Sequence, residues 1–156
     1  MLIVEDGTGL SDADSNVSLD EYATYGGNRG WTLAATDAEN EINLRLGFDA
    51  LNRNWNFLGS SLTDGQAGHF PLSGATEVPR DIKYAQMELA YQIQSGIDIM
   101  PTSIANSIGS EKVKIGPIEV ENGATVSNGR PVIRAVTGLL RVYLAAGAGQ
   151  TALYRG

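Results

Sequence analysis

Residues 36–59 read TDAENEINLRLGFDALNRNWNFLG, and this stretch decides the fold class. It opens with a capping box, in which Thr36 is the N-cap and Glu39 stands at the third helical position. Apolar residues then recur at alternating spacings of four and three, which is the period of one helix face. The stretch therefore predicts an amphipathic helix that ends at Gly59. Its apolar stripe consists of Leu44, Phe48, Leu51, Trp55 and Leu58.

Three further helices are predicted over residues 18–27, 79–96 and 131–147. The first opens with another capping box, formed by Ser18 and Glu21, and ends at a glycine pair. The next opens at a proline, which is tolerated at the first helical position, and both later helices end at glycines. Their apolar faces carry Ile82, Ala85, Leu89 and Ile93, and then Val132, Val136, Leu139 and Tyr143.

Between the last two helices, residues 112–115 and 118–121 alternate polar and apolar side chains, which indicates a half-buried strand. Asn122-Gly123 is a two-residue hairpin signal, but residues 124–127 do not continue the alternation on the same face. The pairing partner of this extended segment therefore stays open, and residues 2–4 are a second candidate strand.

The fold class predicted for the 156-residue chain is mainly α. We expect a small bundle of about four helices, with a short extended β segment or hairpin between helices three and four. The length fits a single domain. A helical domain is expected over residues 1–147, with the β segment inserted at 110–127, followed by a tail over 148–156. A glycine-rich loop over residues 60–77 is expected to be anchored by Phe70-Pro71.

The amino-acid composition argues against several classes of function. The chain has 11 basic and 18 acidic residues, a net charge of −7, and the basic residues are scattered. Because nucleic-acid affinity comes mainly from Lys and Arg that displace counterions, this pattern argues against a general DNA binder. No run approaches the roughly 18 apolar residues that a membrane span needs, so no membrane partner is expected. Without cysteine there are neither disulfides nor thiolate metal sites.

No catalytic, cofactor or metal-binding residues are predicted, and we expect no enzyme. The single histidine, His69, has no sequence neighbour suited to a triad or a zinc site. Asp12-Ala13-Asp14-Ser15-Asn16 begins like a calcium loop, but Val17 stands where that loop requires glycine. Gly7-Thr8-Gly9 lacks the lysine and the following helix of a phosphate-binding loop.

The aromatic residues give little support for base stacking. Trp55 and Tyr143 fall on apolar helix faces, so we expect both in the core. Trp31, close to Arg29, is the only aromatic–basic pairing that resembles a stacking platform. One such pair is weak support for a nucleic-acid site.

Several motifs point to a family. They are the segments at residues 2–9, 70–74, 110–113 and 116–120. With them the chain resembles phage proteins labelled "DnaT-like single-stranded DNA-binding protein", which are encoded among head and neck genes and are similar in design to head-to-tail adaptors. The resemblance spans almost the whole chain, although Phe70 and Leu72 stand where the family often has tryptophan and arginine. It implies a ring, expected to be dodecameric, under the portal.

We therefore predict a structural virion protein, a head-to-tail connector subunit that joins the DNA-filled head to the tail. The expected partners are the portal protein, neighbouring copies in the ring and a downstream neck or tail-completion protein. Double-stranded DNA would pass through the channel without sequence-specific binding. The expected location is the virion neck, after assembly in the host cytoplasm. The alternative is a single-stranded DNA-binding protein of phage replication, and a small hydrolase is a third possibility.

Two contact regions are predicted for the connector role. Lys112 and Lys114 lie at one end of the extended segment, and Glu119 and Glu121 at the other. In a head-to-tail ring the basic end of one subunit would meet the acidic end of its neighbour. The alternative is a solvated strand of mixed charge, because exposed ion pairs contribute only about 0–1 kcal/mol.

The second region is the C-terminal tail, which follows a glycine-containing linker. Leu153, Tyr154 and Arg155 would dock on the portal as an added strand or in a pocket. The alternative is that the tail folds back onto its own subunit.

Overall fold

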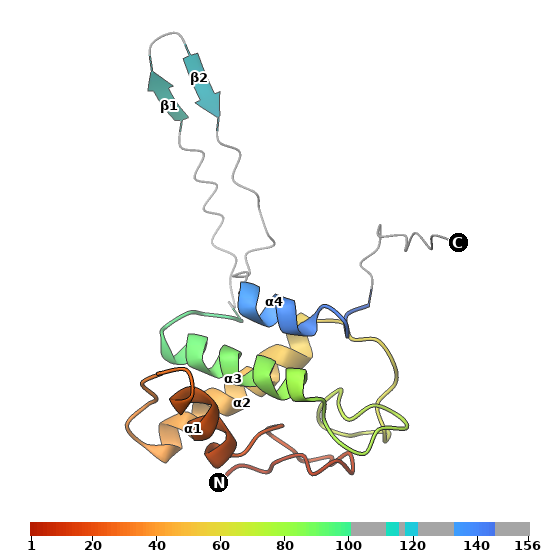
Figure 1. Cartoon of the computed structure of the whole chain (residues 1–156). Helices are drawn as coiled ribbons and strands as arrows, with labels where there is room; N and C mark the ends of the chain where they lie inside the picture. Colours follow the sequence, from red (N-terminus) through yellow and green to blue (C-terminus); the bar gives the residue numbers. More distant parts are fainter. Residues whose placement is uncertain (101–111, 116–117, 122–132, 146–156) are drawn as a thin grey trace, which may run out of the picture.

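The computed structural model describes residues 1–100, 112–115, 118–121 and 133–145. It confirms a mainly α fold (Figure 1). The helices are α1 (Leu19–Gly27), α2 (Asp37–Asn54), α3 (Arg80–Gln94) and α4 (Arg134–Leu140). The strands β1 (Lys112–Ile115) and β2 (Ile118–Glu121) form one antiparallel pair. Among the described residues, no helix has both the length and the hydropathy needed to cross a bilayer.

The first two helices begin where the capping boxes predict. The Ser18 hydroxyl accepts a hydrogen bond from the Glu21 N–H at 3.2 Å, and the Glu21 carboxylate accepts one from the Ser18 N–H at 2.8 Å. Thr36 and Glu39 form the same reciprocal pair at the start of α2, at 3.3 and 3.2 Å. Each box gives partners to N–H groups that have none inside the helix.

Both α2 and α4 end earlier than predicted, and for the same reason. α2 ends at Asn54 and α4 at Leu140, each several residues before the glycine that was expected to stop it. The chain segments that follow the two helices pair as extended backbone, and the Leu58 N–H donates to the Tyr143 carbonyl at 2.7 Å. Leu58, predicted as the last residue of the buried stripe, is consequently 52% exposed.

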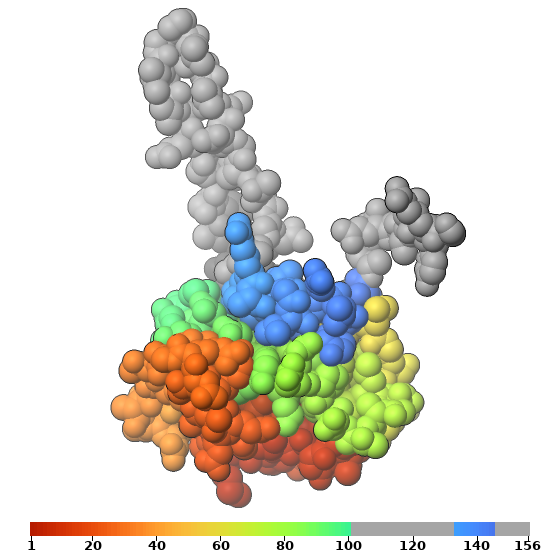
Figure 2. Space-filling view, viewed as in Figure 1, coloured from red at the N-terminus to blue at the C-terminus, as the bar shows by residue number. Residues whose placement is uncertain are grey.

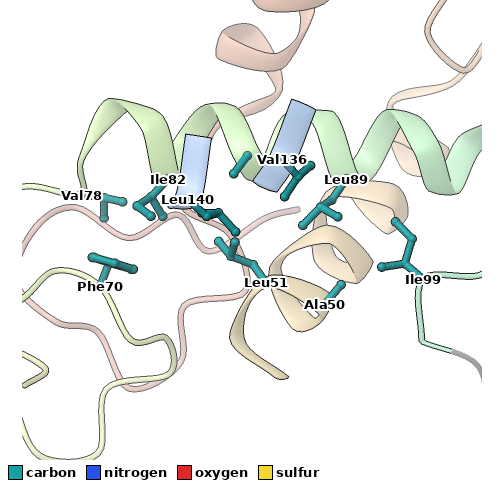
Figure 3. Packing of buried hydrophobic residues seen from close by; sticks show 10 residues of the cluster. Ala50, Leu51, Phe70, Val78, Ile82, Leu89, Ile99, Val136 and Leu140 are labelled. Atoms are coloured by element: carbon teal, nitrogen blue, oxygen red, sulfur yellow. The ribbon is translucent and has the colours of Figure 1, made fainter. Parts of the chain in front are cut away.

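The main hydrophobic core lies between α2, α3, α4 and the loop that precedes α3 (Figure 3). The predicted face of α3 is confirmed, and Trp55 and Tyr143 pack against this core. Phe70 and Pro71 are both buried and hold the loop as expected. Val132 of the predicted fourth face lies outside the described residues. The buried members are Ala50, Leu51, Phe70, Val78, Ile82, Ala85, Leu89, Ile99, Val136 and Leu140.

A second buried cluster joins α1 to α2 and α3. Partly buried aromatic residues, Trp31 and Tyr84, pack against its edge. Within the described part of the chain, α3 therefore lies between the two clusters. It contributes Ile82, Ala85 and Leu89 to the first, and Met87, Ala90 and the partly buried Tyr84 to the second. The buried members of the second cluster are Val17, Tyr22, Tyr25, Leu44, Met87 and Ala90.

Close contact between α2 and α3 depends on Gly47 and Gln86, which hydrophobic periodicity does not identify. A Cβ atom at Gly47 would lie 2.9 Å from the Gln86 carbonyl oxygen, so only glycine fits without a shift of α3. The Gln86 side chain is fully buried and donates to the Leu44 carbonyl at 3.0 Å and to the Ser15 hydroxyl at 2.8 Å. These bonds connect the N-terminal segment, α2 and α3.

The two halves of the predicted extended segment, β1 and β2, pair with each other. In the register of β1 and β2, Lys112 is opposite Glu121 and Lys114 is opposite Glu119, and Gly116-Pro117 separate the strands. The hairpin predicted at Asn122-Gly123 lies outside the described residues.

The N-terminal residues do not supply a strand to this pair. Instead Val4 makes a single parallel bridge with Ser15. The glycine loop that follows binds an anion of its own chain: the backbone N–H groups of Gly7, Gly9 and Leu10 donate to the Glu5 carboxylate at 2.8–2.9 Å.

Candidate nucleic-acid interface

A groove of about 570 Å³ runs between α1 and the N-terminal half of α3. On the face that Figure 2 shows, the orange-red residues of α1 border the green residues of α3. Three of the chain's 11 basic residues line the groove, together with two tyrosines and three carboxylates. These residues are Arg29, Arg80 and Lys83, Tyr25 and Tyr84, and Asp20, Glu21 and Glu77.

The arginines lie against the aromatic rings. The Arg29 guanidinium is 3.4 Å from the centre of the Tyr25 ring, and it lies 5.6 Å from the centre of the Tyr84 ring. Arg80 lies 5.4 Å from the Tyr84 ring. Arg80 is exposed and, among the residues that the structure describes, has no carboxylate within ion-pair distance. The half-buried Tyr84 thus carries two guanidinium groups close to its ring.

A second pair of rings adjoins the groove. Trp31 stacks on Tyr91 with a centroid distance of 4.2 Å and an interplanar angle of 7°. The Trp31 ring also meets Tyr25 edge to face at 5.4 Å, and Tyr25 lies 4.6 Å from Tyr84. Four aromatic rings from α1, the loop after it and α3 therefore form one continuous cluster.

Carboxylates hold two of the three cations. The Lys83 ammonium donates to Glu21 at 2.8 Å. Burial acts to raise the pKa of the Glu21 carboxyl, but the hydrogen bonds from Lys83 and Ser18 outweigh it and leave this pKa below its usual value. Glu88 lies 3.8 Å from Arg29 and accepts a hydrogen bond from the Tyr25 hydroxyl at 3.0 Å. Burial, and then this bond to Glu88, raise the pKa of the Tyr25 hydroxyl.

In the sequence, Trp31 and Arg29 stood out, but the other members of the cluster did not. Tyr25 meets Tyr84, and Trp31 meets Tyr91, only after α1 packs on α3, so no local pattern joins either pair. One signal was available within α3, because Arg80, Tyr84, Glu88 and Tyr91 follow helical spacing along one side.

The residues predicted as contact sites lie elsewhere. Lys112, Lys114, Glu119 and Glu121 belong to β1 and β2, and a contact through them between subunits stays a prediction. The tail residues Leu153, Tyr154 and Arg155, and with them the domain division at residue 147, lie outside the described part of the chain.

The remaining polar candidates make local contacts. His69 lies in its loop between Phe57 and Phe70, with ring centroids 5.4 and 5.2 Å away. Asp14, from the calcium-like segment, accepts a hydrogen bond from Arg45 at 2.6 Å. Within the described residues, no group of three or more histidine or carboxylate side chains is placed to hold a metal ion.

Comparison with known proteins gives one match. The profile of a family described as "Putative DnaT-like ssDNA binding protein" matches residues 1–156. Neither the curated proteins nor the solved structures gave a significant match. The family description overturns the predicted connector role and favours the alternative, single-stranded DNA binding. The match gives no support for a portal or tail-completion partner, and the location in the virion neck stays an untested prediction.

The connector prediction was wrong because it extended the family resemblance to head-to-tail adaptors and took the net charge of the whole chain as evidence against DNA binding. Residues 1–100 contain five basic and fifteen acidic residues, whereas residues 101–156 contain six basic and three acidic ones. A nucleic-acid strand contacts a local surface, and α1 and α3 bring Arg29, Arg80 and Lys83 into one groove. The family profile covers the full length of the sequence, and the chain therefore belongs to this DnaT-like family.

Proposed function

We propose that the protein binds single-stranded DNA in the groove between α1 and α3. The observation that carries this proposal is the half-buried Tyr84 ring, which lies in the groove with the guanidinium groups of Arg29 and Arg80 within 5.6 Å. The description of the family supports the same function. The proposed role is binding alone, without a catalytic step.

This combination of groups suits an unpaired strand. Aromatic side chains bind single strands because every unpaired base offers a π face, and each stacked base contributes about 1–3 kcal/mol. Arginine adds a planar cation that can stack on a base or contact two phosphate oxygens. In a duplex the bases are already stacked on one another, so a Tyr84 platform has no base face to bind.

The start of α3 adds to the attraction for phosphate. Its N-cap, Pro79, offers no side-chain hydrogen bond to the first N–H groups of the helix. Unpaired N–H groups and the helix dipole give this end a partial positive charge. Arg80 lies in the same turn and adds its guanidinium to this positive end, which the carboxylate of Asp81 in that turn partly offsets.

The charges also limit how the protein binds. Each phosphate neutralised on a single strand contributes about −0.7 to the slope of log affinity against log salt. With three cations in the groove, the slope should be no steeper than about −2. Because residues 1–100 carry an excess of acidic residues, we expect modest affinity with a large share from stacking.

Fluorescence anisotropy with a labelled oligothymidylate at low salt tests the proposal. Arg80→Ala and Tyr84→Leu should each weaken binding by about tenfold, which corresponds to roughly 1.4 kcal/mol and lies within the range for one stacked base. Leucine keeps an apolar side chain at position 84 and removes the π face. The matched control is Arg53→Ala, because Arg53 is an exposed arginine on α2 whose partner is Asp49 and which does not line the groove.

A labelled duplex of the same length is the second arm of the experiment. The proposal predicts weaker binding of the duplex and no change of single-strand affinity in the Arg53→Ala variant. Equal losses for Arg53→Ala and Arg80→Ala, or equal affinity for duplex and single strand, would contradict it.

A further inference from the structure

Glu21 has two separate hydrogen-bonding roles at the edge of the groove. Its Oε2 atom accepts from the Ser18 N–H at 2.8 Å and completes the capping box of α1. Its Oε1 atom accepts from the Lys83 ammonium at 2.8 Å and connects α1 to α3. One carboxylate therefore caps a helix and also neutralises a cation in the groove.

We propose that Glu21 acts as an intramolecular competitor for DNA phosphate at Lys83, and this inference rests on the proposed function of the groove. Without DNA, the Glu21 carboxylate forms an ion pair with the Lys83 ammonium. A bound strand must displace it before a phosphate oxygen can take its place. In the free protein, Lys83 is therefore paired with Glu21 and not available to DNA. The cost of breaking this pair lowers the affinity for short or weakly bound strands.

The geometry allows the exchange without loss of structure. The side chains of Glu21 and Lys83 are 44% and 28% exposed, so the pair is accessible to a phosphate from solvent. The bond from Ser18 goes to the other oxygen of Glu21, so α1 stays capped when Lys83 moves. Exposed ion pairs of this kind are weak, which makes displacement by a phosphate feasible.

Glu88 has a different relation to its cation. Its side chain is only 14% exposed, and it accepts a hydrogen bond from the Tyr25 hydroxyl. From this position it lies 3.8 Å from Arg29, whose guanidinium is 3.4 Å from the centre of the Tyr25 ring. Glu88 thus positions a cation for stacking, whereas Glu21 occupies a cation that a phosphate would use.

The test is a double-mutant cycle, with DNA affinity as the measured quantity, that combines Glu21→Gln with Lys83→Ala. Glutamine can still complete a capping box, since this motif accepts Glu or Gln, but it has no charge with which to hold Lys83. Glu39→Gln is the matched control, because Glu39 completes the capping box of α2 and has no basic partner among the described residues. Both substitutions are made with Lys83 present and in a Lys83→Ala background, and oligothymidylate binding is measured over a range of salt.

With Lys83 present, Glu21→Gln should raise the affinity by about two- to fivefold, as expected for loss of one exposed ion pair. The salt slope should change little, because Lys83 contacts a phosphate in both bound complexes and the gain comes from the ion pair that the wild type must first break. In the Lys83→Ala background this gain should vanish, and Glu39→Gln should have little effect in either background.

Two outcomes separate the failure of this inference from failure of the proposed function. If Glu21→Gln raises affinity equally with and without Lys83, the effect is one of net charge, and Glu21 is not a competitor at Lys83. If neither the wild type nor any variant binds the oligonucleotide, the proposed function itself fails.

Discussion

The two sides of α3 differ in how they are built. Toward α2 and α4, the helix presents Ile82, Ala85 and Leu89, all fully buried. Toward α1 it buries Met87 and Ala90, but beside them lie half-buried tyrosines and, near its N-terminus, two basic residues that line a groove. The first side contributes most to stability. The second leaves aromatic and charged groups accessible to a ligand, so it contributes less to stability and can support binding.

The largest expected effect is on the aliphatic side. Leu89→Ala should lower the free energy of unfolding by about 2–5 kcal/mol, because it removes a fully buried side chain and leaves a cavity. Chemical denaturation measures this loss. Under conditions where the variant stays folded, its affinity for oligothymidylate should equal that of the wild type. If Tyr84→Leu lowered the free energy of unfolding by as much as Leu89→Ala, the two sides of α3 would not differ in their contribution to stability.

The next effect concerns the contact between α2 and α3. Gly47→Ala should destabilise the protein by about 1–3 kcal/mol, because the added methyl group overpacks against the Gln86 carbonyl. Helix propensity alone predicts the opposite, a gain of about 1 kcal/mol. Thermal or chemical unfolding decides between the two signs. Gly27→Ala is a useful reference, because a Cβ there meets nothing within 4 Å.

A smaller effect is expected within the aromatic cluster. A double-mutant cycle with Trp31→Leu and Tyr91→Leu should give a coupling energy of about 0.5–1.5 kcal/mol for the stacked pair. Leucine at both positions keeps apolar contact and removes the ring–ring geometry. Additive losses in the two single variants would show that the stack contributes nothing beyond apolar burial.

The smallest effect is the pH dependence caused by Glu21. Its pKa is lower in the folded protein than the ordinary value of 4.5, so its contribution to stability is fully present above that value. The contribution is lost as the pH falls through the lower folded pKa. The difference in stability between the wild type and Glu21→Gln should therefore shrink between neutral pH and strongly acidic pH, measured by urea denaturation. If the stability difference between the wild type and Glu21→Gln grew on acidification, the pKa of Glu21 would not be lowered by folding.

The sequence predicted those parts of the fold that depend on local patterns. The capping boxes at Ser18 and Thr36 placed the starts of α1 and α2, and periodicity identified the buried face of α3. The ends of α2 and α4 could not be predicted, because they depend on backbone pairing between Leu58 and Tyr143, which are far apart in the chain.

The candidate site was predictable only in part. Trp31 and Arg29 stood out because they are close in the sequence, but their meaning depends on Tyr84 and Tyr91, which reach them through the packing of α1 on α3. Net charge misled the functional prediction, since it averages over surfaces that a strand never contacts together. The one local signal for Arg80 was its helical spacing from Tyr84, and nothing in the sequence placed Arg29 beside the same ring.

Photochemical crosslinking of bound oligothymidylate, followed by mass spectrometry of the digested protein, identifies directly the residues that the strand contacts. Stacked thymines lie against aromatic rings, so the account predicts crosslinks at Tyr84 and in the peptides that carry Tyr25 and Trp31. Excess unlabelled single strand should abolish them, and the Tyr84→Leu variant should lose the crosslink in α3. Crosslinks confined to peptides outside α1, the loop after it and α3 would contradict the account.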